Sequence, residues 1–372
     1  MTDLGEARAS LARGRKVSRW PVFVFVLIML AATIYAFSPR ALPPFPPTGV
    51  HANDLLVTGV ARQGKRVLAV GELGQILWAD SATGPWHVAR VTPQHGLTFT
   101  NVAFVGPRTA IAVGHGAVIV RSDDDGKSWR QVSYLPKLGD ALMGVSGPFD
   151  GKLFAYGAFG LLEVSTDNGR SWDSGKFNIT PLPTPAPSAS AANSGNPFAN
   201  YVQPDDPSTH HIYGITQLAD GELLLVGERG LIALSSDHGV TWTQQPKVYP
   251  GSYFGVLKPT RTSVLIYGLG GHVFLSTDGA RTWMPSTLPQ PISMYGGTVL
   301  PDGRVVLVGN QETILVSRDG GRSFTRVSQA DRGNMDSVLA LGAGQLLAAG
   351  MYGVQVKDLA APAVAATTGA GP

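Results

Sequence analysis

The chain contains no cysteine, which excludes disulfide bonds and thiolate metal sites. Charge is also scarce, because Asp, Glu, Lys and Arg make up 15% of the 372 residues and the formal net charge is +3. The basic excess lies within the first 40 positions, and the rest of the chain is close to neutral. The sequence pI of about 9.1 therefore gives no argument for nucleic-acid binding, and no nucleic-acid partner is expected.

Long apolar runs are rare as well, and the longest uncharged run covers residues 21–37. As a helix rising about 1.5 Å per residue it would reach roughly 25 Å, near the lower limit for spanning a bilayer. Five basic residues precede the run: Arg8, Arg13, Arg15, Lys16 and Arg19. By the positive-inside rule, a basic segment of this kind stays in the cytoplasm.

This pattern predicts a cytoplasmic basic tail over 1–19, a transmembrane signal-anchor over 20–38 and a Pro-rich stalk over 39–50. The rest of the chain would then lie in the periplasm or lumen, held at the inner (cytoplasmic) membrane by one span. A cleaved signal peptide is the alternative, although residues 37–40 offer no clear small-residue cleavage site. The absence of disulfides is compatible with export, because a large core needs no covalent staples.

Glycine, in contrast, is abundant, and one glycine-containing phrase returns along the chain. It reads S-x-D-x-G-x-[ST]-W at residues 122–129, 165–172 and 235–242. Weaker copies lie at 276–283, where Ala280 replaces the glycine, and at 317–324, where Phe324 replaces the tryptophan. A decayed copy covers 79–86.

A second marker, an apolar residue followed by glycine, keeps the same spacing. Its intervals are 43, 43, 70, 41, 41 and 41 residues, and strand-like apolar runs separate its copies, which are Gly71, Gly114, Gly157, Gly227, Gly268, Gly309 and Gly350. Repeats of 40–45 residues with this content are typical of a β-propeller with four strands, a to d, in each blade. The sequence therefore predicts an all-β fold, a seven-bladed β-propeller over 51–359, preceded by one N-terminal transmembrane helix.

Two further details concern the closure and the centre of this propeller. The seventh repeat ends after Leu359 without a fourth strand, so we expect residues 48–53 to supply it. The residue 13 positions before each marker glycine is small, which would let the innermost strands converge on a central channel; these residues are Thr58, Asn101, Gly144, Gly214, Gly255, Gly296 and Ser337.

The repeated phrase is interpreted as a structural turn. Its Asp can accept backbone N–H groups, its Gly tolerates positive φ, and its aromatic ring can be buried between blades. The residues concerned are Asp124, Gly126, Trp129, Asp167, Gly169, Trp172, Asp237, Gly239, Trp242, Asp278, Trp283, Asp319, Gly321 and Phe324.

No metal site, cofactor or catalytic residue is predicted. Residues 123–126 resemble the start of a calcium loop, but the D-x-D-x-D-G spacing and the distal Glu are missing. His210 and His211, near Asp205 and Asp206, are better interpreted as a solvated loop than as a metal cluster.

The phrase resembles the Asp box, or bacterial neuraminidase repeat, and the three clean copies look most like those of the photosystem II assembly and stability factor family. That resemblance covers about residues 50–359 and implies a non-enzymatic assembly factor in a lumen or periplasm. A sialidase-like glycan hydrolase is the enzyme alternative. Its chemistry needs an Arg triad, a Tyr nucleophile with a Glu partner and an Asp acid, and the first blade lacks the R-I-P motif of sialidases.

A partner surface is predicted on the face that carries the turns between strands b and c. These turns keep their glycine frame while their other residues vary: Glu72, His115, Phe159, Glu228, Arg229, Gln311, Glu312 and Tyr352. A Pro/Ala/Ser-rich insertion over 180–209, between blades 3 and 4, enters the same face and is expected to be flexible, like the disordered tail at 360–372. The expected partner is a membrane protein complex; the alternative role is that of an accessory subunit of a membrane exporter.

Overall fold

The computed structural model describes residues 19–37, 52, 54–138, 140–175, 177–183, 205–330 and 332–359. The chain divides into two compact units, Met1–Gly49 and Val50–Pro372. The basic tail before Arg19, the Pro-rich stalk at 39–50 and the tail at 360–372 lie outside the described residues.

The first unit contains the helix α1 (Trp20–Phe37), whose apolar side chains are exposed from Trp20 to Tyr35. The chain has no Asp, Glu, Lys or Arg within this helix, as the apolar run predicted. Across the described residues, no helix has the combination of length and apolar character required to cross a membrane. The transmembrane anchor over 20–38 therefore stays a prediction.

The second unit is a propeller of seven antiparallel blades, which confirms the predicted fold. Blades 1 to 3 contain the strands β1 (Val57–Gln63), β2 (Arg66–Gly71), β3 (Ile76–Ala79) and β4 (His87–Val88); β6 (Phe99–Phe104), β7 (Ala110–Gly114), β8 (Val118–Ser122) and β9 (Ser128–Ser133); and β10 (Leu142–Phe149), β11 (Lys152–Gly157), β12 (Leu162–Ser165) and β13 (Asp173–Gly175).

Blades 4 to 7 repeat this order. They contain the strands β15 (Ile212–Gln217), β16 (Leu223–Gly227), β17 (Ile232–Ser235) and β18 (Trp242–Gln244); β19 (Tyr253–Leu257), β20 (Val264–Gly268), β21 (Val273–Ser276) and β22 (Met284–Pro285); β23 (Met294–Val299), β24 (Val305–Gly309), β25 (Ile314–Ser317) and β26 (Thr325–Ser328); and β27 (Met335–Ala340), β28 (Gln345–Gly350) and β29 (Gly353–Asp358).

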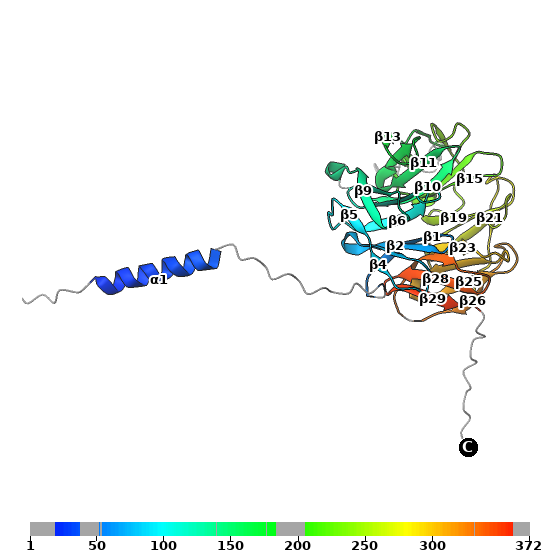
Figure 1. The fold of residues 1–372 in the computed structure, drawn as a ribbon. Helices are drawn as coiled ribbons and strands as arrows, with labels where there is room; N and C mark the ends of the chain where they lie inside the picture. Colours follow the sequence, from blue (N-terminus) through cyan, green and yellow to red (C-terminus); the bar gives the residue numbers. More distant parts are fainter. Residues whose placement is uncertain are drawn as a thin grey trace, which may run out of the picture. The chain divides into compact units, whose positions relative to one another are not determined.

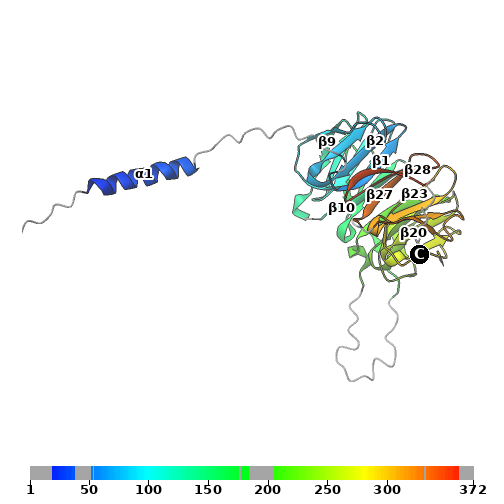
Figure 2. The same cartoon turned by 90° about the horizontal axis from the view of Figure 1, so that it is seen from below.

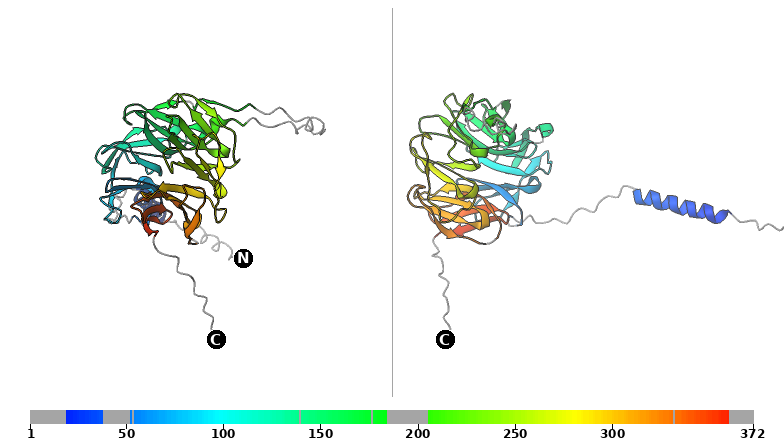
Figure 3. Two further views of the ribbon diagram at one scale, coloured as in Figure 1. Left: turned by 90° about the vertical axis from the view of Figure 1, so that its right-hand side faces the viewer. Right: turned by 180° about the vertical axis from the view of Figure 1, so that it is seen from behind.

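Strand a of each blade is the innermost. Figure 2 shows β1, β10, β23 and β27 gathered in the middle of the propeller, and the other views show the blades following one another around it in chain order (Figure 3). Because every blade has the same antiparallel strand order, all the b–c turns lie on one face of the propeller. The repeated phrases, which connect strands c and d, lie on the other face.

The ring closes between the first and last blades. Figure 1 shows the blue blade 1 beside the red blade 7, and buried apolar side chains from both, such as Val60 and Leu347, form one cluster. At the open edge of β29, the Val354 N–H donates to the Ala52 carbonyl at 3.0 Å. This bond agrees with closure by residues 48–53, of which Ala52 alone is described.

Among the described residues, the core consists of seven clusters, each shared by two neighbouring blades. The aromatic residue of a repeated phrase packs against the preceding blade: Trp242 of blade 4 lies with Phe154 of blade 3, and Phe324 of blade 6 with Leu265 of blade 5. Trp129 and Trp242 are buried, whereas Trp172 and Trp283 are half-buried. The predicted burial between blades is confirmed, and its extent differs from copy to copy.

Two connections between blades extend a sheet outward. β5 (Arg90–Thr92) pairs in parallel with β9, and β14 (Ile179–Thr180) pairs in parallel with β18. The insertion predicted over 180–209 therefore begins inside an ordered strand, and it ends in the short 3-10 helix η4 (Pro207–Thr209). Its central residues 184–204 lie outside the described residues, so their flexibility stays a prediction.

Candidate functional site

The repeated turn has one hydrogen-bond pattern in its five clear copies. In the copy of blade 5, the Ser276 hydroxyl donates to Asp278 at 2.8 Å and accepts the Ala280 N–H at 2.9 Å. Asp278 also accepts the Thr282 N–H at 2.9 Å and the Thr282 hydroxyl at 2.5 Å. Equivalent bonds surround the other four carboxylates: those of Asp124, Asp167, Asp237 and Asp319.

These bonds favour the charged carboxylate. The Thr282 side chain and backbone lower the pKa of Asp278 to about 2, and Ser171 lowers the pKa of Asp167 in the same way. Every polar atom of the Asp278 carboxylate thus has an internal partner. A turn whose carboxylate oxygens are all hydrogen-bonded within the turn is stabilised by its own residues and has few free acceptors for a ligand. This supports the structural interpretation of the repeated turn.

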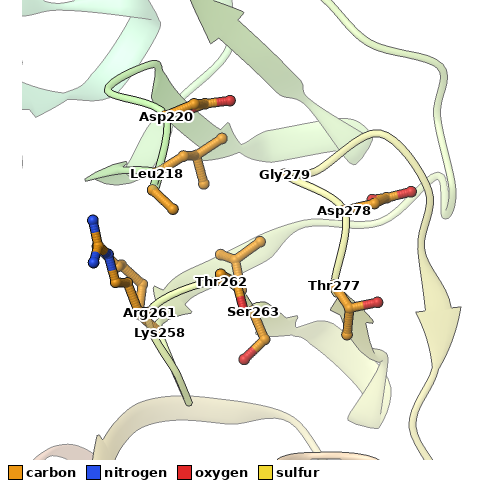
Figure 4. A pocket seen from close by; sticks show the side chains of 11 residues that line it. Leu218, Asp220, Lys258, Arg261, Thr262, Ser263, Thr277, Asp278 and Gly279 are labelled. Atoms are coloured by element: carbon orange, nitrogen blue, oxygen red, sulfur yellow. The ribbon is translucent and has the colours of Figure 1, made fainter.

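Figure 4 shows a cavity of about 220 Å³ on this face, between blades 4 and 5. The Asp278 carboxylate is directed away from Leu218 and Arg261, which line the cavity. Lys258 is already bonded to the Gln217 carbonyl at 2.8 Å. The cavity therefore has no convergent set of polar groups and is a weak candidate for a binding site.

The b–c turns share a different frame. A Cβ at the marker glycine Gly268 would lie 2.1 Å from the Ser252 carbonyl oxygen, and the equivalent contact recurs at all seven marker glycines. The next residue donates its N–H to the same carbonyl, as Leu269 does at 3.0 Å. The marker glycine thus permits the close approach of two backbones, which fixes each b–c turn to the start of strand a.

In six of the seven b–c turns, the second residue after the marker glycine forms the tip of the turn and has positive φ; in blade 7 the positive φ lies one residue later, at Gly353. Four of these tips carry side chains in the left-handed region, where glycine is normally favoured: Leu73 (φ 56°), Phe159 (φ 51°), Arg229 (φ 54°) and Gln311 (φ 57°). Leu73 is 63% exposed and Phe159 is 64% exposed. These apolar side chains point into solvent from strained positions.

The eight predicted partner-binding residues are all on this face but differ in exposure. His115, Phe159, Arg229, Gln311 and Tyr352 are exposed. The other three are glutamates that form internal hydrogen bonds or ion pairs. Sequence reasoning missed the exposed apolar residues Leu73, Leu269 and Met351, although each lies one or two positions after a marker glycine, where the turn points outward.

The three predicted glutamates serve the fold. Glu72 accepts the Leu56 N–H at 3.0 Å, and Glu228 accepts the His211 N–H at 3.2 Å. Glu312 is 3% exposed and pairs with Arg332 at 3.2 Å. Removing these carboxylates would therefore disturb the turns as well as any surface they form.

His210 and Asp205 do not form the solvated loop that we expected. His210 is buried, its Nε2 lies 2.7 Å from the Asp205 carboxylate, and Lys247 contacts the same carboxylate at 2.5 Å. Burial of Pro207 and the cap that Asp206 gives to η4 hold this segment in place. Within the described part of the chain, no group of His, Asp and Glu side chains is arranged to hold a metal ion.

A more distinctive arrangement lies where the b–c face meets the central channel. Strand a of every blade contains a β-bulge at its second residue, and a bulge redirects the extra side chain. The seven bulged residues all line one central cavity of about 460 Å³; they are Thr58, Thr100, Met143, Tyr213, Phe254, Tyr295 and Asp336. We call this set the bulge ring.

The small residues of strand a lie next to the bulge ring. A Cβ at Gly255 would lie 2.2 Å from the Tyr267 hydroxyl, so the glycine makes room for a strand b tyrosine at the channel. The predicted close approach is confirmed, with one correction. In blade 1 the small residue is Gly59, which pairs with Val70, and not Thr58. The stretch between this position and the marker glycine is one residue shorter in blade 1 than in the other blades.

The bulge ring is chemically uneven. Consecutive blades 4, 5 and 6 contribute the aromatic rings of Tyr213, Phe254 and Tyr295, and blade 7 contributes the carboxylate of Asp336. Among the described residues, Asp336 has no hydrogen-bond or ion-pair partner, and it is the one carboxylate that lines the cavity. Burial raises the pKa of Asp336 to about 6. The sequence of a single repeat does not identify this residue, because the alternation of apolar and polar residues in strand a does not reveal which residue is in the bulge.

No protein-family model and no curated protein sequence matches the chain. Solved structures do match its fold. They include YCF48 bound to a D1 peptide (15% identity, TM-score 0.59, 82% of this chain and 92% of that one). YCF48 from Cyanidioschyzon merolae matches at 15% identity and a TM-score of 0.60, over 82% of this chain and 96% of that one.

A GH74 enzyme from Niastella koreensis matches at 16% identity and a TM-score of 0.59, over 83% of this chain. The chain spans about half the length of that enzyme, since 53% of the enzyme is covered. At these identities, the likeness to all three structures shows the β-propeller fold alone.

Proposed function

We propose that this protein is a non-enzymatic binding and assembly factor for a membrane protein complex, and that the b–c face is its working surface. The observation that carries this proposal is the set of exposed side chains at left-handed turn tips, above all Leu73 and Phe159. Strained, exposed apolar residues on a rigid scaffold do not stabilise the fold, whereas they suit contact with a partner. We also assign the repeated turn to the Asp-box class, on its sequence and its hydrogen bonds.

The resemblance of the repeated phrase to photosystem II assembly and stability factors supports this role. The likeness of the fold to YCF48, of which one structure is bound to a D1 peptide, supports it further. An accessory role in a membrane exporter uses the same face and differs in the identity of the partner.

We propose further that α1 attaches the propeller to the inner membrane, with the propeller in the periplasm or lumen. The support is the uncharged, exposed apolar surface of α1 and the basic residues that precede it. A reporter that is active only outside the cytoplasm, fused after Pro372, is expected to be active. Activity of a cytoplasmic reporter alone would contradict the proposed location.

A glycoside hydrolase is the second candidate, and the fold likeness to the GH74 enzyme is the observation that favours it. Hydrolysis by the usual mechanism needs two carboxyl groups on either side of the scissile bond. The central cavity offers one carboxylate, Asp336, among its described lining residues, and no arginine for a sialidase clamp. This composition favours binding over hydrolysis.

Site-specific photo-cross-linking in intact cells tests the proposed face. A photoreactive residue at Phe159 or Tyr352 of the full chain is expected to give cross-links to one membrane protein. The matched control is Val240, which is 61% exposed but lies in the repeated turn of blade 4, on the opposite face. Cross-links from Val240 alone would place the working surface on the other face, and cross-links to no membrane protein from any position would contradict the proposed role.

A further inference from the structure

The bulge ring suggests a specific ligand chemistry for the b–c face. We infer that the mouth of the central channel binds an organic cation, an alkylammonium or a guanidinium group, between the arc of Tyr213, Phe254 and Tyr295 and the carboxylate of Asp336. This inference rests on the proposed function and deepens it, because it names the chemistry by which a partner is recognised.

The aromatic arc is continuous from blade to blade. The ring centroids of Tyr213 and Phe254 lie 5.5 Å apart, and those of Phe254 and Tyr295 lie 5.3 Å apart. Each ring is half-buried at the cavity instead of in an inter-blade cluster. Aromatic faces attract ammonium and guanidinium groups within about 6 Å, and several rings around one site are the usual arrangement for such cations.

The carboxylate completes the site because it has no other partner. The two threonine hydroxyls of the bulge ring are already used: the Thr58 hydroxyl donates to the Phe99 carbonyl at 2.6 Å, and the Thr100 hydroxyl donates to the Leu142 carbonyl at 2.6 Å. No Lys, Arg or His is among the described residues that line the cavity. Asp336 is thus a largely buried negative charge without a counter-ion, and a bound cation would supply one.

An aromatic path connects this site to the exposed turn tips. The ring of His211 lies 4.8 Å from Phe159 and 6.1 Å from Tyr213, so five rings run from the tip of the blade 3 turn to the channel. A partner that contacts Phe159 can therefore reach the channel across one surface. The cavity volume of about 460 Å³ is sufficient for a lysine or arginine side chain.

Saturation-transfer NMR on the purified full-length chain tests this inference with three probes. The first is the peptide acetyl-Ala-Ala-Lys-Ala-Ala-amide, the second is the same peptide with N-acetyl-lysine, which carries no charge, and the third is tetramethylammonium chloride. The lysine peptide is expected to bind and its acetylated form is not. Tighter binding of the peptide would identify a protein side chain as the source of the cation; equal or tighter binding of tetramethylammonium would identify a free small cation.

Variants decide whether the binding occurs at the bulge ring. Asp336→Asn is expected to raise the Kd of the cationic probe at least tenfold, and Phe254→Leu about three- to fivefold. Asp80→Asn removes an exposed carboxylate from the opposite face and serves as the matched charge control, with no change expected. Melting temperatures check that each variant is folded; Asp336 has no hydrogen-bond or ion-pair partner among the described residues, so Asp336→Asn is expected to keep the fold.

Binding that persists in Asp336→Asn, equal binding of the acetylated peptide, or no binding of either cation would overturn the inference. These results can be separated from failure of the proposed function. If the inference alone is wrong, Phe159 still cross-links to its membrane partner in cells, whereas loss of that cross-link would count against the working surface itself.

Discussion

The two faces of the propeller use the same left-handed backbone conformation but occupy it with different residues. On the face of the repeated turns, the first positive-φ position carries residue types that tolerate it: Asp125, Asn168, His238, Gly279 and Gly320. On the b–c face, the corresponding tips include Leu, Phe, Arg and Gln. A left-handed conformation costs such residues about 1 kcal/mol each.

The difference indicates what each face is for. The repeated turns combine residues that tolerate positive φ, carboxylates with internal hydrogen-bond partners and aromatic rings packed between blades, and these three features serve stability. The b–c tips combine strain with exposure, and the adjoining bulge ring holds an unpaired carboxylate, so these features oppose stability. Proteins keep destabilising features of this kind at sites where function requires them.

The largest expected effect concerns the repeated-turn face. Trp242→Ala removes a ring that is 1% exposed and should lower the free energy of unfolding by about 3–5 kcal/mol, because it leaves a cavity between blades 3 and 4. Trp172→Ala should cost less, since Trp172 is half-buried. Chemical denaturation measures both values. Equal, negligible effects would show that the aromatic residues of the repeat do not hold the blades together.

Substitution of Asp336 should change the free energy of unfolding in the opposite direction, by raising it. Its folded pKa of about 6 lies above the ordinary value of 3.8, so the wild-type protein loses stability as the pH rises through this range. Asp336→Asn removes the loss and should raise the free energy of unfolding by about 1–2 kcal/mol at pH 8, after allowance for partial exposure. Near pH 4 the variant and the wild type should unfold alike. A destabilised variant at pH 8 would show that the carboxylate has a structural partner.

The pH dependence of stability should be reversed for Asp278, because its pKa in the folded protein, about 2, lies below the ordinary value of 3.8. The stabilisation by its charged form is complete above about pH 4 and is lost as the pH falls through 2. Asp278→Ala should therefore cost about 1 kcal/mol at pH 7, reduced by exposure, and less at pH 2. Denaturant midpoints across this pH range provide the measurement, and a cost independent of pH would mean that the charge is not involved.

The smallest effect tests the strain directly. Phe159→Gly should raise the free energy of unfolding by about 0.5 kcal/mol, because relief of the left-handed strain exceeds the added flexibility of the unfolded chain. The reverse exchange on the other face, His238→Leu, should lower it by about 1 kcal/mol. If Phe159→Gly instead destabilises the protein, then Phe159 contributes to packing, and the contrast between the faces is weaker than proposed.

Much of the scaffold follows from spacing along the chain. The seven marker glycines and the repeated aromatic residues predict seven blades and inter-blade burial, because each repeat must meet the same backbone contact and the same neighbouring core. The Ser–Asp–Gly pattern also predicts a self-contained turn, since its bonds all lie within eight residues. Local chemistry of this kind can be read from the sequence without knowledge of the neighbours.

The b–c face and the channel could be predicted only in part. Glu312 looks like a surface charge in the sequence, but Arg332 of a later segment and burial under the turn make it internal. Likewise, Asp205 and His210 look solvated in the sequence, but His210 is buried and Lys247 contacts the Asp205 carboxylate. The internal roles of Glu312, Asp205 and His210 depend on contacts with residues that are distant in the chain. The sequence of a single repeat therefore cannot predict them.

Periodicity along the chain was sufficient for the number of blades, the order of the strands and the structural role of the repeated turn, because each depends on contacts that recur in every repeat. The bulge ring required the closed propeller. Closure places the second residues of seven separate strands around one cavity, and a bulge turns each side chain toward it. Tyr213, Phe254, Tyr295 and Asp336 are about 41 residues apart in sequence, and they become neighbours because consecutive blades meet at the axis.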